Sequence, residues 1–210
     1  MCHRYAQCWK VRRPCPGWFL EDGRLVKLAE PFSYIDPDEK SWEVPAGATV
    51  DGASIPRALW TLIGGPFEDK YRNASIIHDW YCDVRSRPWK DTHRVFYHAM
   101  ITSSVPIAQA KLLFAGVYWG GPRWSQTVVE NIVLATTRTL GFVSSFAPEP
   151  MFETVRRRMW RVSEYSFDDS QLDLLQESVK DGDESLESIE SSIDLQLESM
   201  EPEVRDEPLA

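Results

Sequence analysis

The chain has 210 residues, enough for one domain with a sizeable core but few for two complete domains. Its net charge of −9 is unevenly spread: residues 163–210 hold 16 Asp and Glu against 2 Lys and Arg, a net of −14, so residues 1–162 carry +5. No apolar run is typical of a signal peptide or a membrane span, so we expect neither, and we expect a cytoplasmic location in the producing cell. A mildly basic body identifies no partner, and we expect no specific nucleic-acid binding.

The first 50 residues predict short β-strands separated by turn residues. The predicted strands are residues 7–13, 18–20, 24–28 and 41–44. An Asp-Gly pair at residues 22–23, between two apolar runs, is typical of a β-hairpin. We therefore expect a small antiparallel sheet or meander at the N-terminal end.

After residue 47 the pattern becomes helical. Apolar residues recur at spacings of three and four, and Pro88 and Pro106 suit the first turns of two helices. The predicted helices are residues 57–63, 68–84, 88–103, 106–118, 127–140 and 151–162. The fold class is therefore α+β, with the small sheet followed by a bundle of about four to five helices.

The last segment differs in composition from the rest of the chain. Ser, Glu and Asp dominate from residue 163 onward, and aromatic residues are almost absent. Such a segment buries too little apolar area to offset the entropy of ordering it. We expect a single globular α+β domain over residues 1–162 and a disordered acidic tail over residues 163–210.

One polar pair interrupts an apolar helix and is the first candidate for chemistry. His78 and Asp79 lie within residues 76–82, and Asp91 lies on the next helix. In one hypothesis His78 is a general base acting on water, Asp79 binds a hard cation such as calcium, and Asp91 fixes the tautomer of His78. This arrangement would be hydrolytic.

Two other hypotheses use the same residues differently. Imidazole and carboxylates suit a transition metal such as zinc, which His78, Asp79, Asp91 and Asp51 would ligate together. Alternatively the pair is structural, with a packed His78 and with Asp79 capping the loop of Asp51 or pairing with an arginine, either Arg57 or Arg72. The spacing in the sequence does not separate these possibilities.

A loop upstream supplies further candidates. Gly52 permits backbone conformations closed to other residues, and Asp51 and Ser54 suit the cap of a helix that starts near Pro56. In a functional site, Asp51 and backbone carbonyls of the loop would instead supply oxygen ligands or orient His78.

Two further histidines follow on the next helix. His93 lies two residues after Asp91, so we expect it on another face and exposed to solvent. His98 lies seven residues after Asp91 and returns to nearly the same side, which makes it a supporting candidate for the site.

Several separated motifs resemble one family. Val-Asp-Gly-Ala-Ser-Ile-Pro-Arg at residues 50–57, Leu-Ile-Gly-Gly at 62–65, Ala-Ser-Ile-Ile-His-Asp at 74–79, and Asp91 look like the domain of unknown function 1353 family over about residues 18–120. That family is found in tailed phages, prophages and bacteria, so the resemblance implies a phage or prophage origin. It implies no mechanism.

A local resemblance points to the secreted calcium-dependent phospholipases. Their His-Asp helix and facing Asp are similar to His78, Asp79 and Asp91, with Tyr81 nearby, although Cys82 stands where those enzymes have tyrosine. The resemblance implies His78 as base, Asp79 as calcium ligand, Asp91 as partner of His78, and a phospholipid ester as substrate.

The leading hypothesis is a phage-type metal-assisted hydrolase acting on an envelope ester or amide bond. Its catalytic residues are His78 and Asp91, its metal ligands Asp79 and Asp51, and its supporting residues Ser54, Arg57, Tyr81 and His98; the metal is calcium or zinc, and the substrate a phospholipid or another cell-envelope component. The alternative is a non-catalytic phage structural or host-interaction protein, whose acidic tail engages a protein partner. A virion-associated location fits either hypothesis.

Overall fold

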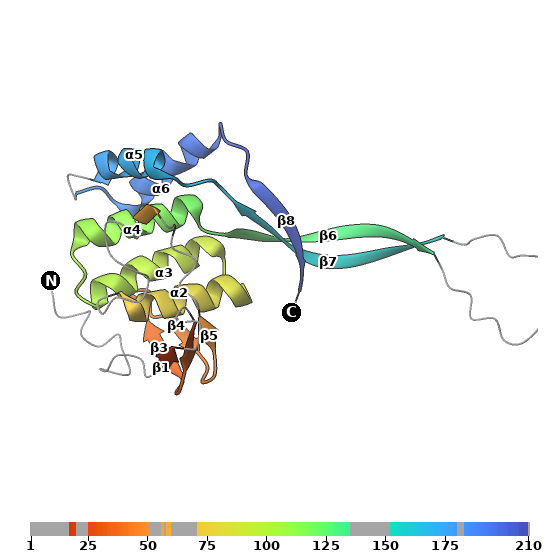
Figure 1. Ribbon diagram of the computed structural model, residues 1–210, viewed down its shortest axis with the longest axis horizontal. Helices are drawn as coiled ribbons and strands as arrows, with labels where there is room; N and C mark the ends of the chain where they lie inside the picture. Colours follow the sequence, from red (N-terminus) through yellow and green to blue (C-terminus); the bar gives the residue numbers. More distant parts are fainter. Residues whose placement is uncertain are drawn as a thin grey trace, which may run out of the picture.

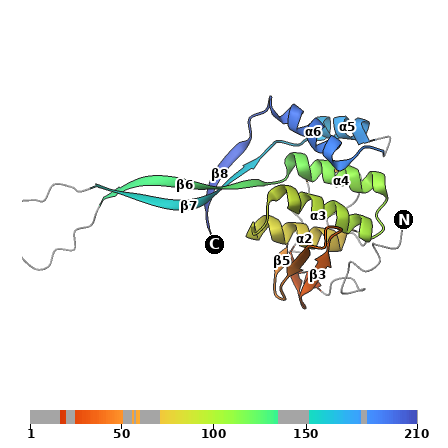
Figure 2. The same ribbon diagram turned by 180° about the vertical axis from the view of Figure 1, so that it is seen from behind.

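The computed structural model describes residues 17–19, 25–50, 56, 58–59, 71–134, 152–179 and 183–209. In Figure 1 the small strands lie against one side of a helical stack, two C-terminal helices lie against the other side, and a long two-stranded arm projects from the body. The same layers appear from behind in Figure 2. The α+β class is confirmed.

Two small antiparallel sheets form the N-terminal layer. The first has the order β1 (Gly17–Phe19), β2 (Val26–Leu28), β5 (Thr49–Val50), and the second pairs β3 (Phe32–Ile35) with β4 (Ser41–Val44). Residues alternate between buried and less buried positions in β3 and β4, which is the pattern of strands that cover a core with one face.

The predicted strands 18–20, 24–28 and 41–44 are confirmed within one or two residues as β1, β2 and β4. The antiparallel pairing of β1 with β2 agrees with the predicted hairpin. The prediction missed β3 and β5, and the predicted strand at residues 7–13 lies outside the described residues.

Three helices follow in the order predicted. They are α2 (Arg72–Val84), α3 (Trp89–Thr102) and α4 (Ile107–Gly120). Pro88 and Pro106 occupy the caps directly before α3 and α4, with extended backbone. The ring fixes φ at about −65°, and proline has no backbone N–H to leave unpaired at a helix start. The core lies between β3, β4 and these helices, and its largest fully buried side chains include Trp42, Tyr34, Ile77 and Phe96.

The two helices predicted for residues 127–140 and 151–162 are wrong wherever the structure describes them. These residues form β6 (Arg123–Leu134) and β7 (Phe152–Glu164), paired antiparallel from Arg123↔Ser163 to Leu134↔Phe152. The β-branched residues of β6, Thr127, Val128, Val129, Ile132 and Val133, favour a strand. The residue types thus indicate a strand where we predict a helix.

The disordered tail is also wrong for the residues that the structure describes. The acidic segment forms α5 (Asp169–Val179), α6 (Leu186–Leu197) and β8 (Glu203–Pro208), and β8 pairs with the base of β7. Four of its Leu and Ile side chains are buried in a cluster with residues of α4, namely Leu175, Ile189, Ile193 and Leu197, while Leu174 and Leu195 are exposed. The predicted domain boundary at residue 162 falls inside β7.

Ion pairs join the acidic segment to the basic body. Glu190 of α6 is buried and accepts two hydrogen bonds from Arg94 of α3, at 2.6 and 2.8 Å. Asp194 lies 3.2 Å from Lys90 and 3.5 Å from Arg123. The excess charges of the two parts therefore face one another within a single chain.

Among the described residues, no helix is both long and apolar enough to cross a bilayer.

We expect Arg94→Ala to lower the free energy of unfolding by about 1–3 kcal/mol, because it leaves the buried Glu190 carboxylate without its main partner. Arg161→Ala is the matched control, since Arg161 also makes a two-bond contact, with Asp206, but on an exposed surface. Urea unfolding of both variants measures the difference. An Arg94→Ala protein as stable as the control would contradict a stabilising contact between Arg94 and the buried Glu190.

Candidate metal centre

Helix α2 places His78 and Cys82 one turn apart on its inward face. His78 is fully buried and Cys82 is 5 % exposed. A spacing of four residues brings side chains onto the same side of a helix, and the Cys82 sulfur lies 3.7 Å from Nε2 of His78. The α2 helix thus supplies one nitrogen and one sulfur donor to the same place.

Helix α3 supplies a third donor from His93. Its Nδ1 lies 2.8 Å from Nε2 of His78, and the His93 side chain is fully buried. The prediction of an exposed His93 is therefore wrong. The physical reason is its spacing to Phe96 and Met100, three and seven residues later, which places it on the face that packs into the core.

The three donor atoms of His78, Cys82 and His93 all lie within 4.8 Å of one another. Aromatic rings surround them: Phe96 lies 4.9 Å from the ring of His78, and Trp89 and Trp124 lie 5.6 and 6.4 Å from the ring of His93. The cluster is thus a polar site enclosed by apolar and aromatic side chains.

The outer nitrogens of the two rings have different surroundings. Nδ1 of His78 lies 3.8 Å from Oδ1 of Asp79. Nε2 of His93 is buried without a hydrogen bond of regular geometry to any described residue, but the Pro122 carbonyl acts on this ring and favours a proton on it. If both outer nitrogens carry protons, the inner nitrogens present two lone pairs to each other at 2.8 Å. Such an arrangement needs a proton or a metal ion between them.

Burial is the main influence on the charge of His93. It lowers the pKa of His93 well below its usual value, and the nearby His78 and the Arg123 guanidinium lower it further, while the Pro122 carbonyl raises it. His93 is therefore neutral at neutral pH, which is the state in which imidazole binds metals.

The structure places three other predicted site residues, Asp91, Tyr81 and His98, outside the cluster. Asp91 lies on the surface in the first turn of α3, 3.3 Å from Lys40, so His93 holds the place next to His78 that was predicted for Asp91. Tyr81 faces β4, where its hydroxyl accepts a hydrogen bond from the Glu43 backbone N–H. Asp51, Ser54 and Arg57 lie outside the described residues.

His98 is not one of the three clustered donors. Its ring lies near that of Tyr97, with centroids 5.5 Å apart, and burial lowers its pKa. The prediction that His98 and Asp91 share a side of α3 does not bring either of them to His78, because the opposite side of α3 faces α2.

One cleft lies beyond the C-terminal end of α2, with a volume of about 440 Å³. Its lining includes Val84, Arg85, Trp160 and Glu207 but none of the three clustered donors. This cleft therefore does not include the cluster.

One known protein family matches the middle of the chain. Residues 26–117 match the family described as protein of unknown function, DUF1353. This confirms the resemblance inferred from the motifs, and the match includes His78, Cys82 and His93. The phage origin and the phospholipase-like activity stay predictions.

Two relatives come from Sinorhizobium fredii. The uncharacterized protein y4jT is 41% identical over 68% of this chain and 44% of its own length. The uncharacterized protein y4iH is 48% identical over 48% of this chain and 42% of its own length. The chain therefore spans less than half of the length of these relatives. No solved structure matches it.

We expect the metal-free protein to lose stability as the pH falls below about 6.5, by up to about 1.4 kcal/mol per pH unit for each affected histidine. The unfolded chain takes up a proton on His93 there, whereas the folded chain resists it because the folded pKa is lowered. Urea unfolding between pH 7.5 and 5 in the presence of a chelator measures this slope.

The variants His93→Gln and His98→Gln show how much each histidine contributes to the pH dependence of the free energy of unfolding, since the pKa of His98 is also lowered. Loss of part of the slope in His93→Gln is the expected result. A slope unchanged by His93→Gln would contradict a neutral, buried His93.

Proposed function

We propose that this protein binds one zinc-class metal ion through His78, Cys82 and His93. The observation that carries the proposal is the convergence of two imidazole nitrogens and one thiol within 4.8 Å in a buried site. Residues of these types are rarely gathered in an apolar core without a partner that balances their polar atoms.

The donor types favour zinc over calcium. A thiolate and two imidazoles suit zinc and related transition metals, whereas calcium takes six to eight oxygen ligands. The carboxylates of Asp79 and Asp91 are not among the clustered donors, and Asp91 is paired with Lys40 on the surface. The proposed ligands thus differ from the carboxylate-rich set predicted from the sequence.

The distances fit with a small adjustment. Zn–N bonds of about 2.0–2.1 Å in a tetrahedron place two ligand nitrogens roughly 3.3 Å apart, and a nitrogen and a sulfur roughly 3.6 Å apart. Cys82 Sγ and His78 Nε2 already lie 3.7 Å apart, while the two histidine nitrogens lie 2.8 Å apart. Metal binding would therefore separate the two rings by about half an ångström and replace their hydrogen bond.

Asp79 would act on the metal through His78. Its carboxylate is buried and lies on the Nδ1 side of the His78 ring, opposite the nitrogen that faces His93. A carboxylate in this position favours a proton on Nδ1 and so keeps Nε2 free to bind a metal. Asp79 thus has a positioning role here in place of the predicted role as ligand.

The proposed role of the metal is to fix α2 against α3. The ligands come from both helices, and they are buried among aromatic rings. Structural zinc sites have four protein ligands, whereas catalytic sites have three and keep the fourth position for water or substrate. The described residues supply three donors, so the structural role is argued from their burial and from their position on two helices, and not from the number of ligands.

We expect purified wild-type protein to bind one zinc ion and Cys82→Ala or His93→Ala to lower its affinity at least tenfold, because each variant removes a ligand. Calorimetric titration of the apoprotein measures the affinity. Cobalt substitution adds a second signal, a thiolate-to-cobalt charge-transfer band that Cys82→Ala abolishes.

Two controls separate this site from other metal ligands in the chain. Asp91→Asn should leave affinity and stoichiometry unchanged, as should a variant with Ser at positions 2, 8 and 15 in place of Cys2, Cys8 and Cys15. If wild type binds no zinc, or if Asp91→Asn removes it while Cys82→Ala does not, the proposal is wrong.

A further inference from the structure

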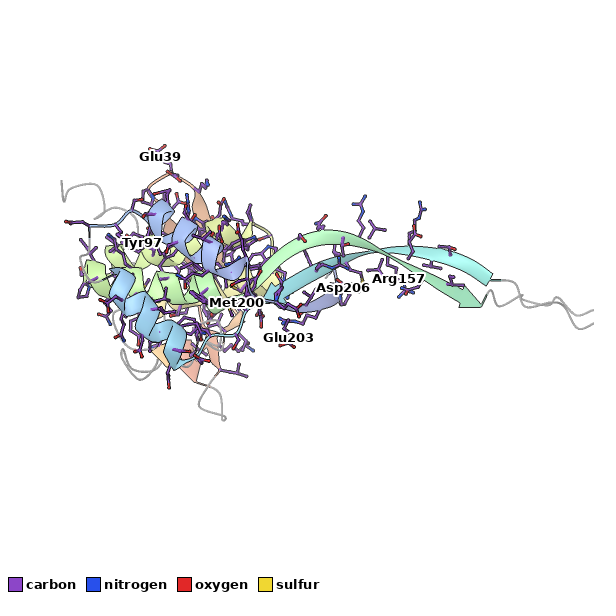
Figure 3. The ribbon with its side chains drawn as sticks, turned by 90° about the horizontal axis from the view of Figure 1, so that it is seen from above. Glu39, Tyr97, Arg157, Met200, Glu203 and Asp206 are labelled. Carbon is purple, nitrogen blue, oxygen red and sulfur yellow. The ribbon has the colours of Figure 1, made fainter. Side chains whose placement is uncertain are left out.

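The arm formed by β6 and β7 extends well beyond the body of the protein (Figure 1). β8 pairs with β7 only from Met159 to Glu164, near the base of the arm. In Figure 3, Arg157 lies on the arm beyond Asp206 and Glu203 of β8. Past this point the described arm is a two-stranded ribbon without a third strand.

A ribbon of this kind needs further contacts. Two isolated strands are marginally stable in water, and each outer edge exposes backbone N–H and C=O groups that can pair with another strand. Apolar side chains on β6 are also exposed here: Val128 is 56 % exposed and Ile132 is 74 % exposed. The arm therefore offers both backbone and side-chain groups to a partner.

The two edges of the arm differ in charge. Residues 154–158 of β7 include three charged side chains, Arg156, Arg157 and Arg158. Residues 127–134 of β6 include a single charge, Glu130, which already pairs with Arg156 at 2.6 Å. Charged edge residues discourage pairing between chains, so β7 is protected and β6 is not.

We propose that the outer edge of β6 pairs with β6 of a second copy of this chain, in antiparallel register about a two-fold axis. Identical strands related by a two-fold axis pair antiparallel, and each copy then satisfies the other's edge. The result is a four-stranded sheet in the order β7, β6, β6 of the partner copy, β7 of the partner copy. The nearly uncharged β6 edge permits self-pairing, because two copies of β6 side by side bring few like charges together.

The expected affinity is low. A strand of 12 residues is roughly 40 Å long at about 3.4 Å per residue, and a sheet is about 10 Å thick, so each copy would bury on the order of 400 Å². A standard stable interface buries about 800 Å² per partner. Dimerisation should therefore be reversible, with monomer and dimer both present at micromolar protein concentrations.

Ile132→Glu and Thr154→Glu test this pairing as a matched pair. The two residues lie directly opposite each other, on the same face of the arm, and both are exposed. On β6 the new carboxylate would replace an exposed apolar side chain of the pairing strand and add a charge to it in each copy, which should weaken dimerisation at least tenfold. On β7 the same charge stays away from the pairing edge, and the dimer constant should change less than twofold.

Sedimentation velocity of the full chain across micromolar concentrations gives the dimer constants, and circular dichroism checks that both variants fold. Hydrogen exchange gives an independent readout, because dimerisation should slow exchange of β6 amides in residues 127–132 and leave residues 153–157 unchanged. A wild type that stays monomeric throughout, equal loss in both variants, or protection confined to β7 would overturn the proposal.

Discussion

The contact between His78 and His93 is the constraint around which the helical body is arranged. It joins the middle of α2 to the first half of α3 through two fully buried rings. Polar groups in such a place are costly unless they are matched, and they leave few alternative registers for the two helices. Cys82, Phe96 and the tryptophans around the pair must then pack to its shape. A metal ion among these donors would strengthen a link that the fold already makes.

The acidic C-terminal segment completes the enclosure of this pair. Asp194 of α6 accepts a hydrogen bond from Tyr118 and lies near Arg123, whose guanidinium is 4.6 Å from the ring centroid of Trp89. Trp89 in turn packs against His93. Asp194 of the acidic segment thus contacts Arg123, Arg123 lies over Trp89, and Trp89 helps to bury His93. That burial is the main cause of the lowered pKa of His93.

Local signals in the sequence predicted the elements with distinct starts and stops. Pro88 and Pro106 mark the starts of α3 and α4, and the hydrophobic spacing of residues 68–84 identifies α2. The arm and the acidic segment were missed for a different reason. β6 and β7 make their backbone hydrogen bonds to each other, and α6 buries its apolar side chains against α4, so both depend on partners distant in the sequence. The β-branched residues of β6 indicate a strand, but composition does not give the partner of that strand.

The site was predicted in part, because the His78 pair was found but the partner of His78 was not. Electrostatic reasoning favours Asp91, because a carboxylate is a common partner of histidine. Asp91, however, lies on the exposed side of the first turn of α3. The spacing of His93 to Phe96 and Met100 gave the inward face of α3 and was visible in the sequence. In an amphipathic helix, the apolar stripe decides which polar residue reaches the interior. That rule selects His93 over Asp91 on α3, whereas on α2 it places His78, Asp79 and Cys82 all in the interior.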